Sequence, residues 1–161
     1  MFKENLTKDM TPEPEIIQKI ESATKGQSTN KLWFQHRKGV ITASKAHEVK
    51  TKMKTIESYP NGSEKSDVLM WSLTKKVAGF SFVNPNIPAL KYDRNMEPLA
   101  ASNFLELMKT KHKGAKLVEC GLFLDKEKPY IGASPDGVFF CDCCCEKSVW
   151  RLNAHKSFIT D

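Results

Sequence analysis

Residues 121–138 of the chain read GLFLDKEKPYIGASPDGV, and this stretch decides the fold. Apolar residues and turn-forming residues predict a strand over 117–124, a turn, and a hairpin partner over 130–133. A Pro-Asp-Gly turn then leads into a third strand over 138–140. We therefore expect three short strands in succession, with tight turns between them.

The sequence before this stretch is helical in character. Helical spacing of apolar residues and suitable N-cap residues predict helices that begin at Pro12, Leu32, Ala43, Ser66 and Ala89, the last one reaching Lys111. Helices thus come first, and strands begin only near residue 116. This order predicts an α/β domain with N-terminal helices followed by an incomplete small mixed sheet.

Length and composition are those of one folded domain. The chain has 161 residues, of which 40% are hydrophobic and 27% charged, which excludes an intrinsically disordered protein. The sequence has no apolar run long enough to span a membrane. It begins MFKEN, without the apolar core of a signal peptide, so we expect an intracellular protein of the nucleus or cytoplasm.

The net charge of +6 is concentrated in one segment. Residues 31–60 hold seven Lys or Arg residues against two Glu residues. A basic segment of this kind is typical of a nucleic-acid partner. A solvated, lysine-rich helix face explains the charge equally well.

Four of the five cysteines lie between residues 141 and 145, and only Cys120 lies elsewhere. An odd number of cysteines without a signal peptide indicates reduced thiols rather than a disulfide framework. Zinc sites usually take their ligand pairs from separate segments, and the chain has no second pair. A zinc site is therefore the less favoured interpretation of these cysteines.

Two acidic residues are candidate metal ligands. Asp136 follows Pro135 at the start of a predicted strand, where its carboxylate can bind a hard cation. Glu97 lies in the last predicted helix among apolar residues and can point toward Asp136. Two converging carboxylates suit Mg²⁺ or Mn²⁺. An ordinary Pro-Asp-Gly turn and an exposed helical Glu are the simpler alternatives.

Residues 33–44, WFQHRKGVITAS, form a candidate phosphate site. They join Arg37 and Gly39 to a helix that begins after Thr42. A guanidinium group, hydroxyl groups and the amide N–H groups of a helix N-terminus together suit a phosphate. A capped helix that follows a surface arginine is the alternative.

Together, these blocks resemble the YqaJ-type viral recombinase family, the relatives of phage lambda exonuclease in the PD-(D/E)xK nuclease superfamily. The matching residues are Trp33, Arg37, Gly39 and 41–44, then Arg94, Glu97 and Ala100, then 121–123 and 129–138. The resemblance covers residues 15–145 and implies a restriction-endonuclease-like core. Asp93 departs from the family pattern, which has a glycine there.

The resemblance implies an Mg²⁺- or Mn²⁺-dependent 5′–3′ exonuclease of double-stranded DNA that acts in recombination and DNA-end processing. Asp136 and Glu97 then correspond to the catalytic metal ligands. Arg37, Ser44 and Ser134 correspond to the residues that hold the 5′-phosphate. The partners implied are double-stranded DNA ends and two further copies of the chain in a ring-shaped homotrimer.

The resemblance also implies a Glu-x-Lys pair on the strand after residues 138–140. Its Glu binds metal and its Lys orients the attacking water. Residues i and i+2 share a face of a strand, whereas Glu146 and Lys147 are adjacent and would point to opposite faces. The Glu-x-Lys pair is therefore missing from this position.

Codons compatible with residues 149–155 contain, in another frame, the codons for Leu-Glu-Ile-Lys-Cys-Pro. We hypothesise an N-terminal helix and loop over 1–30, an incomplete nuclease domain over 31–145 and an out-of-frame tail over 146–161. A chain truncated in this way should end its sheet at the strand 138–140, bind Mg²⁺ weakly or not at all, and be inactive and marginally stable.

Two alternatives stay open from the residues. The chain can be a non-catalytic DNA-binding fragment that uses the basic segment 31–60. It can also be a small zinc-binding module built on the cysteines at 141–145. Salt-dependent DNA binding without cleavage would favour the first, and stoichiometric zinc the second.

Overall fold

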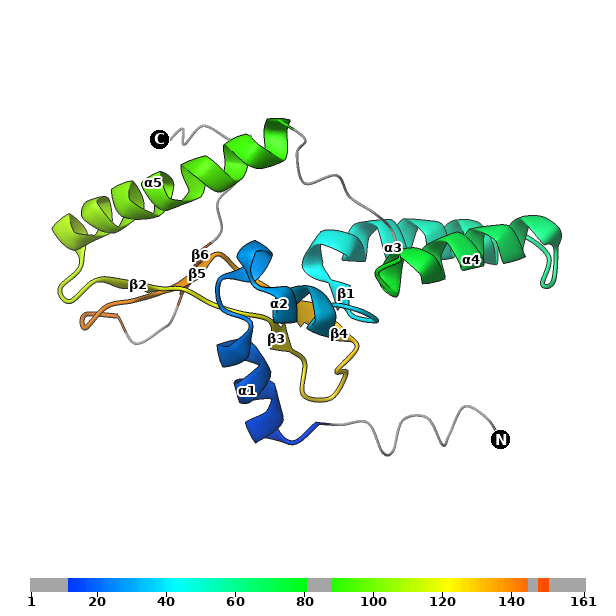
Figure 1. Cartoon of the computed structure of the whole chain (residues 1–161), viewed down its shortest axis with the longest axis horizontal. Helices are drawn as coiled ribbons and strands as arrows, with labels where there is room; N and C mark the ends of the chain where they lie inside the picture. Colours follow the sequence, from blue (N-terminus) through cyan, green and yellow to red (C-terminus); the bar gives the residue numbers. More distant parts are fainter. Residues whose placement is uncertain (1–11, 81–87, 145–147, 151–161) are drawn as a thin grey trace. The chain divides into compact units, whose positions relative to one another are not determined.

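A computed structural model of the chain describes residues 12–80, 88–144 and 148–150 (Figure 1). The described residues fall into two compact units. The first unit contains residues 12–80 and 121–134, and the second contains residues 88–120 together with the described residues from 135 onward.

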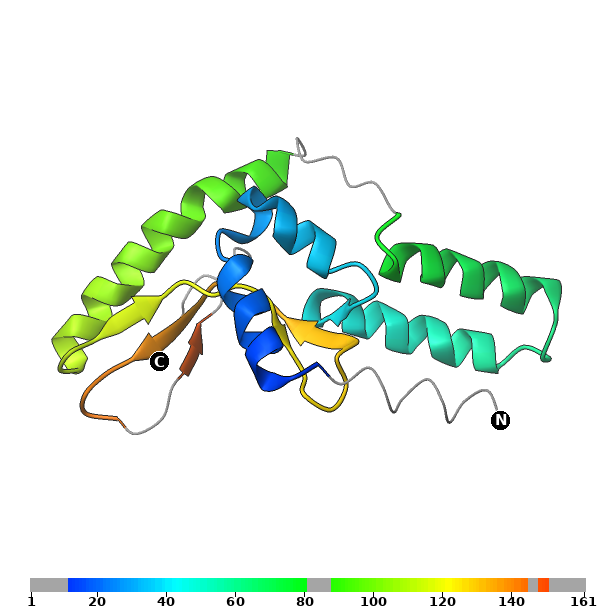
Figure 2. The same cartoon turned by 60° about the horizontal axis from the view of Figure 1, so that its bottom comes forward.

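Helices make up most of the first unit. They are α1 (Pro14–Ala23), the 3₁₀ turn η1 (Gln27–Thr29), α2 (Lys31–His36), α3 (Ala43–Glu57) and α4 (Glu64–Val77). The side chain of Asn30 caps α2 by accepting a bond from the Leu32 N–H at 2.9 Å. α3 and α4 lie side by side (Figures 1 and 2), and Glu48 of α3 pairs with Lys76 of α4.

The sheet of the first unit is small and mixed. Its strands are β1 (Ile41–Thr42), β4 (Ile131–Ala133) and β3 (Phe123–Leu124), in that spatial order. β1 and β4 are parallel, whereas β3 and β4 form an antiparallel hairpin. Helices followed by a small mixed sheet are what the sequence predicts, and this prediction is confirmed.

α1 is held against the segment before β3 by two hydrogen bonds. The Glu21 carboxylate accepts a bond from the Gly121 N–H at 3.0 Å, and the Thr24 hydroxyl accepts one from the Leu122 N–H at 2.7 Å. Thr24 and Leu122 are both fully buried. A Cβ at position 121 would overlap the Glu21 carbonyl oxygen, so this close approach requires glycine.

The second unit consists of one long helix and an antiparallel sheet. α5 (Pro88–Lys111) packs on β2 (Lys116–Val118), which pairs with β5 (Gly137–Phe140), and β5 pairs with β6 (Ser148–Trp150). Phe139 of β5 is buried, and its ring meets the ring of Phe104 edge-on at 5.7 Å. This contact fixes the helix over the sheet (Figure 2).

The prediction of one continuous strand over 117–124 is wrong. The segment contributes two strands, β2 and β3, to two different sheets. The hydrogen bonds to α1 hold Gly121 and Leu122 outside the backbone pairing of either sheet. The prediction that strands begin only near residue 116 is also wrong. Residues 41–42 form β1, because their amide groups pair with β4 from far along the chain.

The predicted end of the sheet at the strand 138–140 is wrong as well, because Val149 of β6 pairs with Val138 of β5. An open edge of β5 offers N–H and C=O groups to any extended segment nearby. Two helix starts also differ from prediction by two residues each. α1 begins at Pro14 rather than Pro12, and α4 begins at Glu64, where Ser63 rather than a later residue is the cap.

Several predicted features lie outside the described residues. They are the N-cap Thr11, the Pro-rich break before Pro88 and the tail after residue 150. Among the helices that the structure describes, none has both the length and the apolar character needed to cross a membrane.

Candidate functional site

Arg37 lies at the C-terminal end of α2, where its guanidinium group is held on two sides. It stacks on the Trp33 ring with 3.8 Å between the guanidinium carbon and the ring centroid. Its Nη2 donates to the hydroxyl of Thr42 at 3.2 Å and to that of Ser44 at 3.4 Å. Thr42 does not cap α3 with its side chain, because its hydroxyl faces Arg37 and Ser44 instead.

Trp33 also contacts Ser134. The indole Nε1–H donates to the Ser134 hydroxyl at 2.9 Å. Thr42 ends β1 and Ser134 follows β4, and the parallel pairing of these strands brings both residues to the same end of the sheet. The structure thus assembles Trp33, Arg37, Thr42, Ser44 and Ser134 into one group, which we call the Arg37 cluster.

Lys45 adds a second positive charge beside the Arg37 cluster. Its Nζ donates to the carbonyl oxygen of Lys76 at 3.3 Å. Burial lowers the pKa of Lys45, and the charges of Arg37 and Lys76 lower it further. Like charges gathered at a half-buried position favour an anion there. The basic segment found in the sequence contains this residue but does not single it out.

Three carboxylates interact in the second unit. Glu97 is half-buried in α5, Asp136 immediately precedes β5, and Glu119 immediately follows β2. Burial raises the pKa of Glu97, and the negative charges of Asp136 and Glu119 raise it further. Asp93 and Arg94 are also in α5, but their side chains lie outside the described residues.

Glu119 is absent from the sequence-based candidates, although strand register points to it. Val118, the last residue of β2, pairs with Val138 of β5. Because the strands are antiparallel, Glu119 lies level with the start of β5, next to Asp136. The sequence does not contain that register in any local pattern. Only the pairing of β2 with β5 brings Glu119 to the two predicted carboxylates.

The oxygen donors of these three residues suit a hard divalent cation, which would relieve their mutual repulsion. They do not form a compact group of ligand atoms. Within the described residues, the only such group is His112 with Cys141, Cys143 and Cys144.

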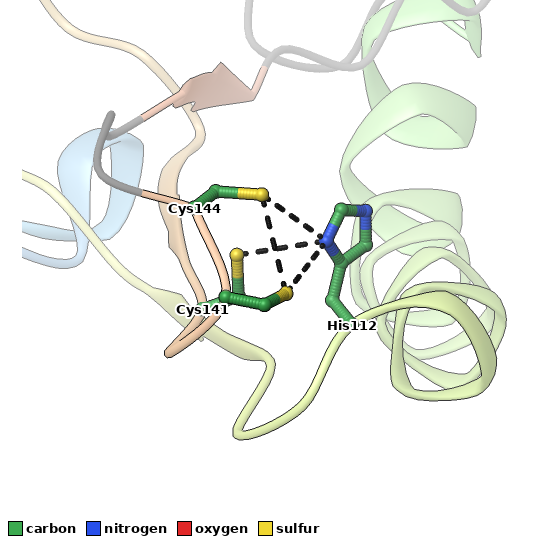
Figure 3. A group of neighbouring side chains, drawn as sticks. His112, Cys141 and Cys144 are labelled. Carbon is green, nitrogen blue, oxygen red and sulfur yellow. Dashed lines mark hydrogen bonds between the residues drawn. The ribbon is translucent and has the colours of Figure 1, made fainter.

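In this second group, which we call the His-Cys cluster, three thiols surround one imidazole nitrogen. The sulfur atoms of Cys141, Cys143 and Cys144 lie 3.6, 3.4 and 3.5 Å from His112 Nδ1. Figure 3 shows Cys141 and Cys144 pointing toward the ring. Hydrogen bonds with Cys141 and Cys143 raise the pKa of Cys144 to about 11.

His112 is a candidate ligand that is absent from the sequence-based prediction. The sequence offers no second pair of ligands beside the cysteines, whereas the structure places a single histidine, directly after α5, next to them. A lone histidine far from the cysteines in sequence has no local signal. Cys145 is the fourth cysteine of the run and lies outside the described residues.

The comparison with known proteins agrees with the resemblance found in the sequence. A family model described as viral alkaline exonuclease matches residues 5–157. No curated protein and no solved structure matches the chain. The family match includes the Arg37 cluster, the three carboxylates and the His-Cys cluster. Because nearly the whole sequence is matched, the chain belongs to the viral alkaline exonuclease family, a family of nucleases.

Proposed function

We propose that the chain recognises 5′-phosphorylated ends of double-stranded DNA through the Arg37 cluster, with Arg37, Ser44 and Ser134 as the phosphate-binding residues. The observation that carries this proposal is the guanidinium of Arg37, stacked on Trp33 and directed at two hydroxyl groups. In the family, this recognition would belong to a 5′–3′ exonuclease that processes DNA ends for recombination.

The chemistry of the Arg37 cluster suits a terminal phosphate. A phosphate monoester carries more negative charge and more terminal oxygens than the diester linkages inside a strand. A guanidinium group binds two such oxygens in one plane, and stacking on Trp33 keeps that plane in place. The hydroxyls of Ser44 and Ser134 are additional donors. In an active nuclease of the family, selection of a 5′ end would set the direction of digestion.

Glu97 and Asp136 are proposed as catalytic metal ligands, with Glu119 as a further carboxylate beside them. Their oxygens fit Mg²⁺ or Mn²⁺, and burial together with the negative charges of Asp136 and Glu119 raises the pKa of Glu97. A bound metal ion of this kind activates water and neutralises charge on the scissile phosphate. The contribution of this chain is the carboxylate oxygens that hold the ion.

We also propose that this 161-residue chain does not cleave DNA by itself. The strand that follows β5 in the chain and pairs with it is β6, whose residues Ser148, Val149 and Trp150 carry neither a carboxylate nor an amine. The Glu-x-Lys pair that the family chemistry requires is therefore not on this strand. A DNA-end-binding protein without nuclease activity is the second candidate function, and this observation favours it.

The binding proposal is tested with fluorescent duplexes that differ only in a 5′-phosphate or a 5′-hydroxyl. Anisotropy in EDTA should show tighter binding of the phosphorylated duplex, and Arg37→Gln should remove the difference. Lys50→Gln, which removes one charge from an exposed position of α3, should weaken binding of both duplexes alike. Equal phosphate preference in the wild type and the Arg37 variant would contradict the proposal.

The catalytic proposal is tested by cleavage of 5′-phosphorylated linear duplex with Mg²⁺ or Mn²⁺. The wild-type chain should leave the duplex intact. A variant with Val149→Leu, Trp150→Glu, Arg151→Ile and Leu152→Lys carries Leu-Glu-Ile-Lys and should degrade it. Adding Asp136→Asn to this variant should abolish degradation. Metal-dependent cleavage by the wild-type chain would show that the proposed inactivity is wrong.

By the family resemblance we expect a homotrimer that surrounds the duplex. Light scattering of the purified chain measures its mass directly, and three times 18.2 kDa is the expected value. A monomer at micromolar concentration would contradict this assignment.

A further inference from the structure

The pairing of β2 with β5 creates the His-Cys cluster. Lys116 at the start of β2 pairs with Phe140 at the end of β5. The turn that precedes β2 therefore lies next to the segment that follows β5, and the Asp142 N–H donates to the Lys113 carbonyl at 2.8 Å. His112 and Cys141 are consequently brought to the same end of the β2–β5 strand pair. Cys143 and Cys144 follow on the same segment.

The turn is built for this close approach. Gly114 has a φ of 65°, and a Cβ there would overlap the Asp142 carboxylate. The His112 ring meets the buried Phe139 ring edge-on, with centroids 5.5 Å apart. This contact holds the imidazole with Nδ1 toward the thiols (Figure 3). The backbone of His112 is anchored too, since its N–H donates to the Met108 carbonyl at 2.8 Å.

The distances in the cluster match a tetrahedral zinc centre. Zn–S bonds of about 2.3 Å and Zn–N bonds of about 2.0–2.1 Å separate sulfur from nitrogen by about 3.5 Å and sulfur from sulfur by about 3.8 Å. The three Sγ–Nδ1 distances in the structure are 3.6, 3.4 and 3.5 Å. The sulfurs of Cys143 and Cys144 are 4.0 Å apart, and all four ligand atoms lie within 4.8 Å of one another.

We propose that His112, Cys141, Cys143 and Cys144 bind a structural Zn²⁺ ion. Three thiolates and one imidazole select a borderline-soft ion such as zinc over Mg²⁺, which prefers oxygen donors. Four protein ligands complete the tetrahedron and leave no position for a substrate or a catalytic water, so the site is structural. It shares no residue with the group of Glu97, Glu119 and Asp136, and its sulfur and nitrogen donors differ chemically from their carboxylate oxygens.

The zinc ion would tie the end of α5 to the exit of β5. α5 carries Glu97, and β5 directly follows Asp136. The ion would therefore stabilise the arrangement of the two elements that carry the predicted catalytic carboxylates. Metal removal should destabilise this unit, because binding free energy at a structural zinc site is folding free energy.

The first test is the metal content of the full chain, purified with a reductant and freed of loosely bound ions. Elemental analysis should find about one zinc per chain. Cys144→Ser and His112→Ala should each lose most of this zinc. Removing even a residue that only hydrogen-bonds to a metal ligand lowers metal affinity about 10- to 100-fold, and these two variants remove a ligand itself. Cys120→Ala and His47→Ala remove the same residue types outside the cluster and should retain the wild-type content.

Cys145 provides a stricter control because it is adjacent in sequence. Cys145→Ser should keep the zinc that Cys144→Ser loses. The opposite pattern would overturn the ligand assignment.

Cobalt gives a readout that does not depend on stability. Co²⁺ added to the metal-free chain should produce the thiolate charge-transfer band and the strong visible bands of tetrahedral cobalt. Both should fall in Cys144→Ser and stay in Cys120→Ala. If the reduced wild-type chain holds less than about one tenth of a zinc ion and gives no tetrahedral cobalt spectrum, the zinc proposal is wrong.

Discussion

At the scale of single residues, Trp33 determines the geometry of the Arg37 cluster. One face of its indole supports the Arg37 guanidinium, and its N–H binds the Ser134 hydroxyl. Two residues about a hundred positions apart are thereby positioned by the same ring. A phosphate-binding group gains most from such support, because a guanidinium that is already oriented loses less conformational entropy on binding.

Trp33→Phe should lower the free energy of unfolding by about 1 kcal/mol, because Ser134 loses a part-buried hydrogen-bond donor. The same variant should bind the 5′-phosphorylated duplex more weakly. Trp71→Phe makes the same chemical change at a side chain that is 62% exposed, and it should alter stability by less than about 0.5 kcal/mol. Urea unfolding of both variants measures the difference. Equal effects would contradict the role given to the indole N–H.

Lys45 predicts a dependence of stability on pH. Burial and the charges of Arg37 and Lys76 lower its pKa below the usual 10.5, so the folded state binds this proton less tightly than the unfolded state. The protonated ammonium therefore costs stability at neutral pH, and the cost is lost as pH rises through the lowered pKa.

Lys45→Met should accordingly be more stable than the wild type near neutral pH, and the difference should shrink as pH approaches 10.5. Urea unfolding at several pH values measures this difference directly. Lys50→Met is the control on the same helix, at an exposed position. A stability difference that stays constant across the pH range would rule out the titration of Lys45 as its cause.

At the scale of secondary-structure elements, α1 and β3 depend on one buried hydroxyl group. The Thr24 hydroxyl donates to the Ile20 carbonyl at 2.6 Å and accepts from the Leu122 N–H at 2.7 Å. It thus binds a carbonyl at the end of α1. It also accepts the bond from the Leu122 N–H, which has no strand partner because Leu122 lies between β2 and β3. A buried N–H without a partner is costly, so this contact determines where the predicted strand is interrupted.

Thr24→Val keeps the shape of the side chain but removes the hydroxyl. The Leu122 N–H then stays buried without its acceptor, and we expect a loss of about 1–3 kcal/mol in the free energy of unfolding. Thr24→Ser retains the hydroxyl and should lose less. Hydrogen exchange at Leu122 should accelerate in the Val variant only. Identical exchange in the two variants would show that the hydroxyl does not protect this amide.

At the scale of the whole molecule, the predicted functions are divided between the two units. The Arg37 cluster is built entirely from the first unit, whereas Glu97, Glu119 and Asp136 all belong to the second. The groups proposed for phosphate recognition and for metal binding are therefore assembled from separate sets of contacts. A substitution in one group that leaves the fold intact should therefore not change the binding affinity of the other group.

Arg37→Gln should weaken binding of the 5′-phosphorylated duplex about tenfold or more, because it removes charge-assisted hydrogen bonds worth about 1.5–3 kcal/mol. Asp136→Asn should leave that affinity within about twofold when binding is measured in EDTA. Fluorescence anisotropy with the two duplexes separates the two outcomes. A large loss of phosphate preference in the Asp136 variant would show that the sites are coupled.

The sequence was most informative where the signal is local. Spacing of apolar residues predicted α2, α3 and α5 closely, and the Pro-Asp-Gly turn placed β5. The structure brings Arg37, Ser44 and Ser134 into one group, since Trp33 and the pairing of β1 with β4 join their segments. Their functional roles stay predictions. The sequence does not predict β1, because a strand of two residues shows no periodicity. Residues 41–42 form a strand only because they pair with β4.

By itself, then, the sequence determined the family, most of the helices and the residue types available for chemistry, because these depend on composition and on neighbours within a few positions. The tertiary structure decided that residues 117–124 divide between two sheets, that Glu119 joins the carboxylates and that His112 joins the cysteines. Each of these results depends on strand register and on contacts between distant segments. Those contacts form only when the chain buries its apolar side chains and pairs its backbone, so no local pattern contains them.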